Sequence, residues 1–131
     1  MMKMKEEKYE IYQIVFSEVP KDRVPLAKED TSMRLQAIKE AVVNEFGGYT
    51  AVAAVGGYVF KDGKTIVIDE PSHIFYISTA GGYASIKKMA IKIGRIFEQE
   101  SVVIVKPDNS TELIFIEEGS KIDDEFKGAS K

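Results

Sequence analysis

The segment from Tyr49 to Thr79 most constrains the fold, because it holds two strand-like stretches joined by a tight turn. Tyr49–Phe60 and Lys64–Thr79 are both rich in the β-branched and aromatic residues that favour strands. Asp62-Gly63 lies between them and favours a tight hairpin turn. The segment therefore predicts two antiparallel strands at the centre of the chain.

Two short motifs within this hairpin predict irregular strand pairing. Gly56-Gly57 weakens an ordinary strand and indicates a β-bulge or a close approach of another backbone. At Glu70-Pro71 the proline cannot donate a ladder hydrogen bond, so we expect an interruption of the second strand there. His73–Ser78 is again strand-like.

Segments with helical periodicity lie on both sides of the hairpin. Asp30, Thr31 and Ser32 offer N-caps for a helix from about Ser32 to Phe46, which Gly47 can end. A second helix is predicted from Tyr83 to about Gln99. Its apolar residues fall within one arc of a helical wheel: Ile86, Met89, Ala90, Ile93, Ile96 and Phe97.

Three further strands are predicted at the two ends of the chain: Tyr9–Ser17, Ser101–Lys106 and Thr111–Glu117. The segment after the first strand, residues 18–30, contains two prolines and has neither hydrophobic period, so it is predicted to be a loop. We interpret this loop as a surface crossover. The alternative is a lid or a partner-binding loop with Val24 and Leu26 as its apolar contacts.

The order of these elements predicts one α+β domain over residues 1–131, with frayed tails at 1–8 and 119–131. Two βαβ crossovers joined by a hairpin give the ferredoxin-like βαββαβ sandwich, here with an extra C-terminal strand. Both helices would cover one face of an antiparallel sheet. The other face, carrying Tyr12, Ala51 and Ala53 or their alternates, would stay open, and we expect it to form a homo-oligomer.

Composition excludes several classes of protein. No apolar run approaches the roughly 20 residues that span a bilayer, and no signal peptide is recognised, so a cytoplasmic protein without membrane contact is expected. The absence of cysteine excludes disulfides, thiolate catalysis and cysteine-bound metals, and we predict no metal and no cofactor. A net charge of -3 makes nucleic acid an unfavourable partner for the molecule as a whole.

Several short motifs resemble a small family of uncharacterised proteins with a ferredoxin-like arrangement. They are Gly48-Tyr49-Thr50, Gly57 before the hairpin, Glu70-Pro71-Ser72 and Phe97-Glu98-Gln99-Glu100-Ser101-Val102. Tyr58 stands where a tryptophan would be expected. The resemblance covers about Phe46 to Val105 and implies a fold without an activity. The topology is also similar to that of PII-like signalling proteins, although their nucleotide-binding motifs are not recognisable.

His73 is the only histidine and therefore the only candidate for histidine acid–base catalysis. Asp69 and Glu70 are its nearest acidic neighbours in sequence, which makes the three residues a candidate catalytic set. Pro71 makes the spacing between Asp69 and His73 unreliable. The alternative is a histidine held by hydrogen bonds at a strand bend or an interface.

A second candidate site lies where the hairpin leads into the second helix. Free backbone N–H groups and the helix dipole favour an anion there, which makes a ligand site of Ser78, Thr79, Gly81, Gly82 and Tyr83. The motif lacks the lysine of a P-loop and the three glycines of a dinucleotide fold. The alternative is an ordinary helix start.

Charged residues of the second helix suggest two further contacts. Lys88, Lys92 and Arg95, with Ile91 beside them, form either a solvated face or a contact with an acidic protein partner. Glu98 and Glu100 oppose the dipole at the helix end, so we expect a cation from another subunit, a polar pocket or a solvated turn to hold them. A paired-carboxylate catalyst is a weaker alternative.

Together these features favour a small soluble oligomeric module that binds a small anionic ligand or a protein partner, with no catalysis assumed. One alternative is a small hydrolase or isomerase that uses His73 with a nearby carboxylate. The other is a structural or inhibitory protein-interaction module.

Overall fold

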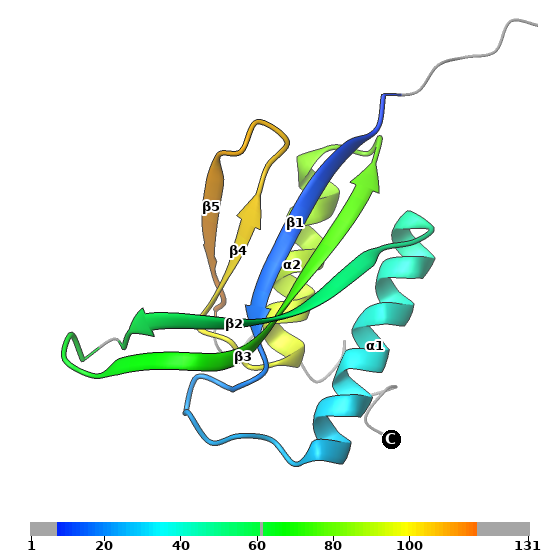
Figure 1. Cartoon of the computed structure of the whole chain (residues 1–131). Helices are drawn as coiled ribbons and strands as arrows, with labels where there is room; N and C mark the ends of the chain where they lie inside the picture. The colour runs from blue at the N-terminus through cyan, green and yellow to red at the C-terminus, as the bar shows by residue number, and fades with distance from the viewer. Residues whose placement is uncertain (1–7, 61, 118–131) are drawn as a thin grey trace, which may run out of the picture.

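The structure, a computed structural model, describes residues 8–60 and 62–117 of the chain. It contains a five-stranded antiparallel sheet of order β2-β3-β1-β4-β5 and two helices (Figure 1). The elements are β1 (Glu10–Ser17), α1 (Lys28–Phe46), β2 (Thr50–Val59), β3 (Ile66–Thr79), α2 (Tyr83–Ile96), β4 (Ser101–Val105) and β5 (Thr111–Phe115). This confirms the predicted α+β, ferredoxin-like arrangement. The predicted tails lie outside the described residues, except for Lys8.

Both helices pack on one face of the sheet and bury a single core. Alternate residues of β1 and β3 point toward the helices, so that Ile14, Phe75 and Ile77 are fully buried. The Phe16 ring lies 5.7 Å from the Phe75 ring and 5.6 Å from that of Phe97 at the end of α2. Neither described helix is long and apolar enough to cross a membrane.

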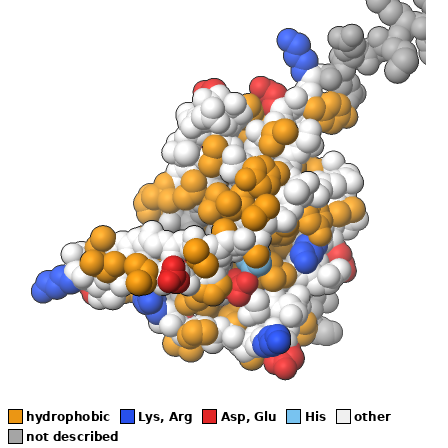
Figure 2. All heavy atoms as spheres, in the orientation of Figure 1, with side chains coloured by type: hydrophobic (Ala, Val, Ile, Leu, Met, Phe, Trp, Pro, Cys, Tyr) orange, Lys and Arg blue, Asp and Glu red, His pale blue; other side chains and the backbone are white. Residues whose placement is uncertain are grey.

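No described helix covers the other face of the sheet, which we call the open face. Tyr12, Ala51 and Ala53 belong to the helix-facing side, since Ala51 and Ala53 pair with Phe75 and His73. Their alternates therefore form the open face. Ile11, Val52, Leu113 and Phe115 are exposed apolar side chains there, and Figure 2 shows hydrophobic atoms gathered over this face.

Helix α1 begins at Lys28, four residues before the predicted start. Its N-cap is Ala27, whose carbonyl accepts a hydrogen bond from the Thr31 N–H at 2.9 Å. Asp30 lies inside the first turn, where the helix dipole stabilises a carboxylate. It also forms an ion pair with Arg34 at 2.9 Å. The predicted capping roles were therefore wrong. The predicted end is confirmed: Gly47 adopts a φ of 87° and donates to Val43.

The second helix and the last two strands are shorter than predicted. α2 ends at Ile96 because Glu98 adopts a left-handed φ of 52°, and the Gln99 N–H turns back to the carbonyl of Gly94 at 2.8 Å. β4 and β5 end at Val105 and Phe115.

The hairpin extends beyond the rest of the sheet as a two-stranded arm, comprising Gly56–Val59 of β2 and Ile66–Glu70 of β3 (Figure 1). The pairing register shifts between Gly56 and Tyr58, which confirms the predicted bulge. A Cβ atom on Gly57 would lie 3.1 Å from the carbonyl oxygen of Val67, so a glycine permits this close approach. The extra residue of the bulge lies in β3, where Ile68 and Asp69 together oppose Gly57, and Asp69 has a left-handed φ of 55°.

β3 runs unbroken from Ile66 to Thr79, so the predicted interruption of the strand at Glu70-Pro71 was wrong, although the bulge at Ile68-Asp69 lies directly before it. The Pro71 carbonyl accepts from Glu18, on the side where β1 has just ended. N–H and C=O groups of one strand residue point to the same side, so the proline nitrogen faces away from β2. No hydrogen bond of the β2–β3 ladder is lost, and the proline is tolerated within the strand.

Candidate functional site

A cleft of about 430 Å³ lies between the arm and the open face. We call it the arm cleft. Val15, Val103 and Leu113 supply an apolar floor, while Tyr58 and Phe60 come from the arm and its tip. The volume falls within the roughly 300–1,000 Å³ range of small-molecule sites. The lining also includes three charged residues, Lys21, Glu70 and Glu100, so the cleft combines an apolar floor with charged groups.

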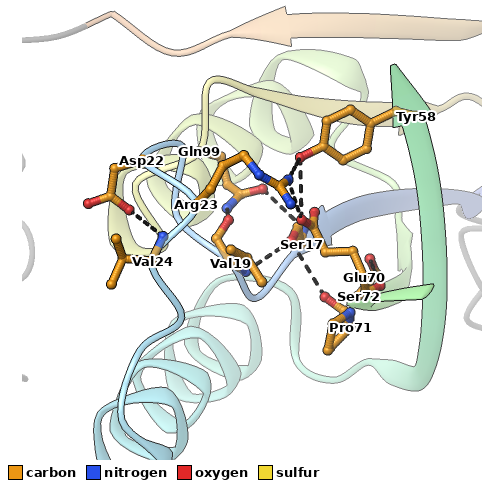
Figure 3. Close-up of polar contacts among 10 residues, drawn as sticks. All are labelled: Ser17, Val19, Asp22, Arg23, Val24, Tyr58, Glu70, Pro71, Ser72 and Gln99. Carbon is orange, nitrogen blue, oxygen red and sulfur yellow. Dashed lines mark hydrogen bonds and ion pairs between the residues drawn. The ribbon is translucent and has the colours of Figure 1, made fainter. Parts of the chain in front are cut away.

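Glu70 is the most deeply buried charged residue of the arm cleft, with 7% of its surface exposed. The Tyr58 hydroxyl donates to its Oε1 atom at 3.3 Å, and Arg23 Nη1 lies 3.4 Å from the same oxygen (Figure 3). Burying a carboxylate is costly unless a cation or hydrogen-bond donors compensate. The Tyr58 hydroxyl comes from the arm and the Arg23 guanidinium from the loop before α1, and both contact the Glu70 carboxylate.

Tyr58 is held in its neutral, donating form. Its pKa is raised because burial disfavours the phenolate, and the charge of Glu70 acts in the same direction. Arg23 opposes this shift and donates to the Tyr58 hydroxyl at 3.0 Å. At neutral pH the neutral phenol therefore donates a hydrogen bond to the carboxylate.

Gln99 anchors the loop of residues 18–27, which carries Arg23 (Figure 3). Its side chain is buried, and its Oε1 accepts from the Ser17 N–H at 3.1 Å. Its Nε2 donates to the carbonyls of Val19, at 2.8 Å, and Phe97, at 3.1 Å. One amide therefore joins the end of β1, the loop and the turn after α2.

The structure separates the predicted catalytic set of His73, Glu70 and Asp69. Strand alternation places Glu70 on the open face, whereas His73 faces the helices beside the Phe16 ring, 5.5 Å away. His73 Nε2 lies 2.5 Å from Glu18 Oε2, so its carboxylate partner comes from the loop. Asp69 is exposed at the bulge.

The predicted anion-binding residues lie at the far end of β3, away from the arm cleft. The Gly81 N–H is satisfied by Thr79 Oγ1 at 2.9 Å, and Gly82 precedes α2 with a φ of 83°. Tyr83 turns its hydroxyl to Glu112. Ser78 is exposed on the open face, opposite Ile11. Anion binding at this turn stays a prediction.

The four predicted partner-binding residues lie together. Lys88, Ile91, Lys92 and Arg95 line one groove of about 480 Å³ on α2, with Glu45 of α1 across from them. The helix itself contains no acidic residue. A contact with an acidic partner stays a prediction. Glu98, by contrast, is held within the same chain by Arg34, at 3.2 Å, so no second subunit is needed to explain it.

Sequence reasoning missed Arg23, Tyr58 and Gln99 as members of one site. The only local signals were the Gly56-Gly57 pair beside Tyr58 and the prolines that flank Arg23 in the loop. Within residues 8–60 and 62–117, no group of three histidine, aspartate or glutamate side chains is placed to hold a metal ion.

Comparison with known proteins supports the fold of the chain and does not show its activity. No family model and no curated protein matches the sequence. A solved structure of a phage SAM lyase in complex with S-methyl-5'-thioadenosine is similar, with a TM-score of 0.64 and 18% identity over 90% of this chain and 98% of that one. The same kind of enzyme in the apo state gives a TM-score of 0.58 and 19% identity over 89% and 96%. These identities show a shared fold, and the resemblance to an uncharacterised family gains no support.

Proposed function

We propose that the arm cleft binds S-adenosylmethionine and that the chain cleaves it, releasing S-methyl-5'-thioadenosine. The observation that carries this proposal is the buried carboxylate of Glu70 in a cleft with apolar walls. The fold shared with phage SAM lyase supports it. A buried carboxylate favours a cationic group, which differs from the anionic ligand expected from the sequence.

S-Adenosylmethionine has a cationic group and an aromatic ring, which match the carboxylate and the aromatic side chains of the arm cleft. S-Adenosylmethionine carries a positive sulfonium, which a carboxylate attracts more strongly in a partly desolvated site than in water. Its adenine ring is planar, and Tyr58 and Phe60 supply aromatic surface on which it can stack. Forming the thioether breaks the bond between sulfur and the γ-carbon of the methionine chain, and the electron pair of that bond stays on sulfur. The carbon fragment closes onto its own carboxylate oxygen or loses a proton, so no co-reactant is required.

The test is incubation of the full chain with S-adenosylmethionine, followed by chromatographic detection of the thioether product and calorimetric measurement of binding. Glu70→Gln should weaken binding by about 2 kcal/mol or more, roughly thirtyfold, because it removes the charge partner of a desolvated cation. Glu45→Gln removes a carboxylate far from the cleft and serves as the matched control. Absence of both binding and product in the unmodified chain would refute the proposal.

We also propose that the open face joins copies of the chain into a homo-oligomer. Exposed apolar side chains from β1, β2 and β5 are contiguous there, and faces of this kind usually meet another subunit. Ile11→Lys and Val52→Lys should shift the sedimentation coefficient to that of a monomer. Neither residue lines the arm cleft, and Val43→Lys, an exposed apolar position on α1, is the control. An unmodified chain that sediments as a monomer at micromolar concentration would refute this assembly.

A further inference from the structure

Arg23 contacts two residues that line the arm cleft, Tyr58 and Glu70, from a loop that is fixed to the body of the protein. The Lys21 N–H donates to the Glu98 carbonyl at 2.9 Å, and Gln99 holds the Val19 carbonyl two residues earlier. Arg23 itself has a left-handed φ of 65°, and its N–H donates to Pro20 at 2.8 Å. A non-glycine residue in this conformation is held by its surroundings. The backbone therefore presents the guanidinium to the cleft.

The guanidinium balances the charge of Glu70 without enclosing it. Its side chain is 34% exposed, whereas that of Glu70 is 7% exposed, so Arg23 lies on the solvent side of the pair. Their separation of 3.4 Å exceeds the about 2.7–2.9 Å of a tight charge-assisted bond. The Phe60 ring lies 5.3 Å from the guanidinium carbon and offers it a second favourable surface. Moving the Arg23 guanidinium away from Glu70 therefore requires little free energy.

A cationic ligand and Arg23 would compete for the same carboxylate. Two cations within about 4 Å of one another repel, and a single carboxylate compensates only one charge. Once the sulfonium becomes a neutral thioether, the product has no charge with which to compete for Glu70. The charge on Glu70 then favours the return of Arg23.

We infer that Arg23 is an internal counter-ion of Glu70 that the cationic substrate displaces, and that this competition lowers the preference of the site for charged substrate over neutral product. This inference rests on the proposed function. It makes Arg23 a specificity-determining residue, because Arg23 balances the charge of Glu70 in the empty site and only a cationic ligand has to displace it.

The test compares the unmodified chain with Arg23→Gln by calorimetric titration with S-adenosylmethionine and, separately, with S-methyl-5'-thioadenosine. Partly exposed ion pairs contribute up to about 1 kcal/mol, so the variant should bind the sulfonium about two- to fivefold more tightly. Affinity for the thioether should stay unchanged, so the ratio of the two affinities rises. Arg23→Lys keeps the charge and should restore the original ratio. Lys88→Gln, a cation lost on α2, controls for net charge.

If Arg23 had only a structural role, Arg23→Gln would weaken the binding of both ligands and leave the ratio of their affinities unchanged. Equal or weaker sulfonium binding by Arg23→Gln, with binding intact in the unmodified chain, overturns the inference and leaves the proposed function standing. Absence of sulfonium binding in every variant overturns both. Thermal unfolding of each variant verifies that it is folded. If Arg23→Gln is not folded, Arg23→Met, which also removes the charge, provides the same comparison of affinities.

Discussion

The Tyr83 hydroxyl donates to Glu112 Oε1 at 2.5 Å, which joins the first residue of α2 to β5. Lys106 completes this cluster: its Nζ lies 3.2 Å from Glu112 and 4.5 Å from the centre of the Tyr83 ring. The three side chains connect the N-terminal end of α2 with the β4–β5 hairpin. They also explain why Tyr83 does not turn toward the predicted anion site.

Removal of the carboxylate should lower the pKa of Tyr83, which is raised to about 12 by burial first and then by Glu112. A phenol whose pKa is raised in the folded state stabilises it below pH 10, and that contribution is lost as the pH rises from 10 to about 12. Glu112→Gln should therefore shift the phenolate absorbance of Tyr83 to lower pH and shrink the alkaline loss of stability. Tyr83→Phe identifies the signal, and an identical titration curve for Glu112→Gln would contradict the prediction.

Gly94→Ala should destabilise the protein, although alanine is the better helix former by about 1 kcal/mol. An added Cβ would lie 2.5 Å from Ile116 Cδ1 and 3.0 Å from Val102 Cγ2. Overpacking of this kind costs about 1–3 kcal/mol, which exceeds the gain in helix propensity. Urea denaturation should show the loss. The double variant Gly94→Ala with Ile116→Ala should recover part of it, and full additivity of the two changes would argue against the clash.

The sequence predicted those elements whose structure depends on the residues of one short segment, through their hydrophobic periodicity or a glycine. Ile86, Ala90 and Ile93 recur at helical spacing and are all fully buried, so periodicity alone located α2. Gly57 likewise lies at the bulge it predicts. The α1 start was missed because the backbone of Ala27, rather than a polar side chain, caps the helix.

The candidate site was largely hidden from the sequence because its contacts join distant positions. Arg23 and Glu70 are 47 residues apart, and Gln99 and Ser17 are 82 apart. No local spacing encodes such a pair, since it depends on how loop and sheet pack together. His73 was singled out for its chemistry, yet strand alternation turned it away from Glu70.

His73→Gln should leave cleavage of S-adenosylmethionine within about twofold of the unmodified chain. The imidazole lies on the helix-facing side of the sheet, bound to Glu18, and does not line the arm cleft. Loss of that half-buried contact should instead lower the free energy of unfolding by about 1 kcal/mol. Product formation under saturating substrate measures the first effect and urea denaturation the second. A large loss of turnover in a variant that remains folded would reinstate the histidine as a catalytic candidate.

Gln99→Leu should lower the free energy of unfolding, because the Gln99 side chain joins the loop to the end of β1 and to the turn after α2. Leucine has nearly the same length but leaves the Ser17 N–H and the Val19 carbonyl without their partner. Unsatisfied buried groups cost about 1–3 kcal/mol each, so a loss of about 2–4 kcal/mol is expected in urea denaturation. Gln36→Leu on the exposed face of α1 is the matched control and should change stability by less than about 0.5 kcal/mol. If Gln99 positions Arg23, the variant should also bind the sulfonium more tightly relative to the thioether, a change in the same direction as that of Arg23→Gln. If folded Gln99→Leu has the same ratio of the two affinities as the unmodified chain, Gln99 does not position Arg23 and its role is purely structural.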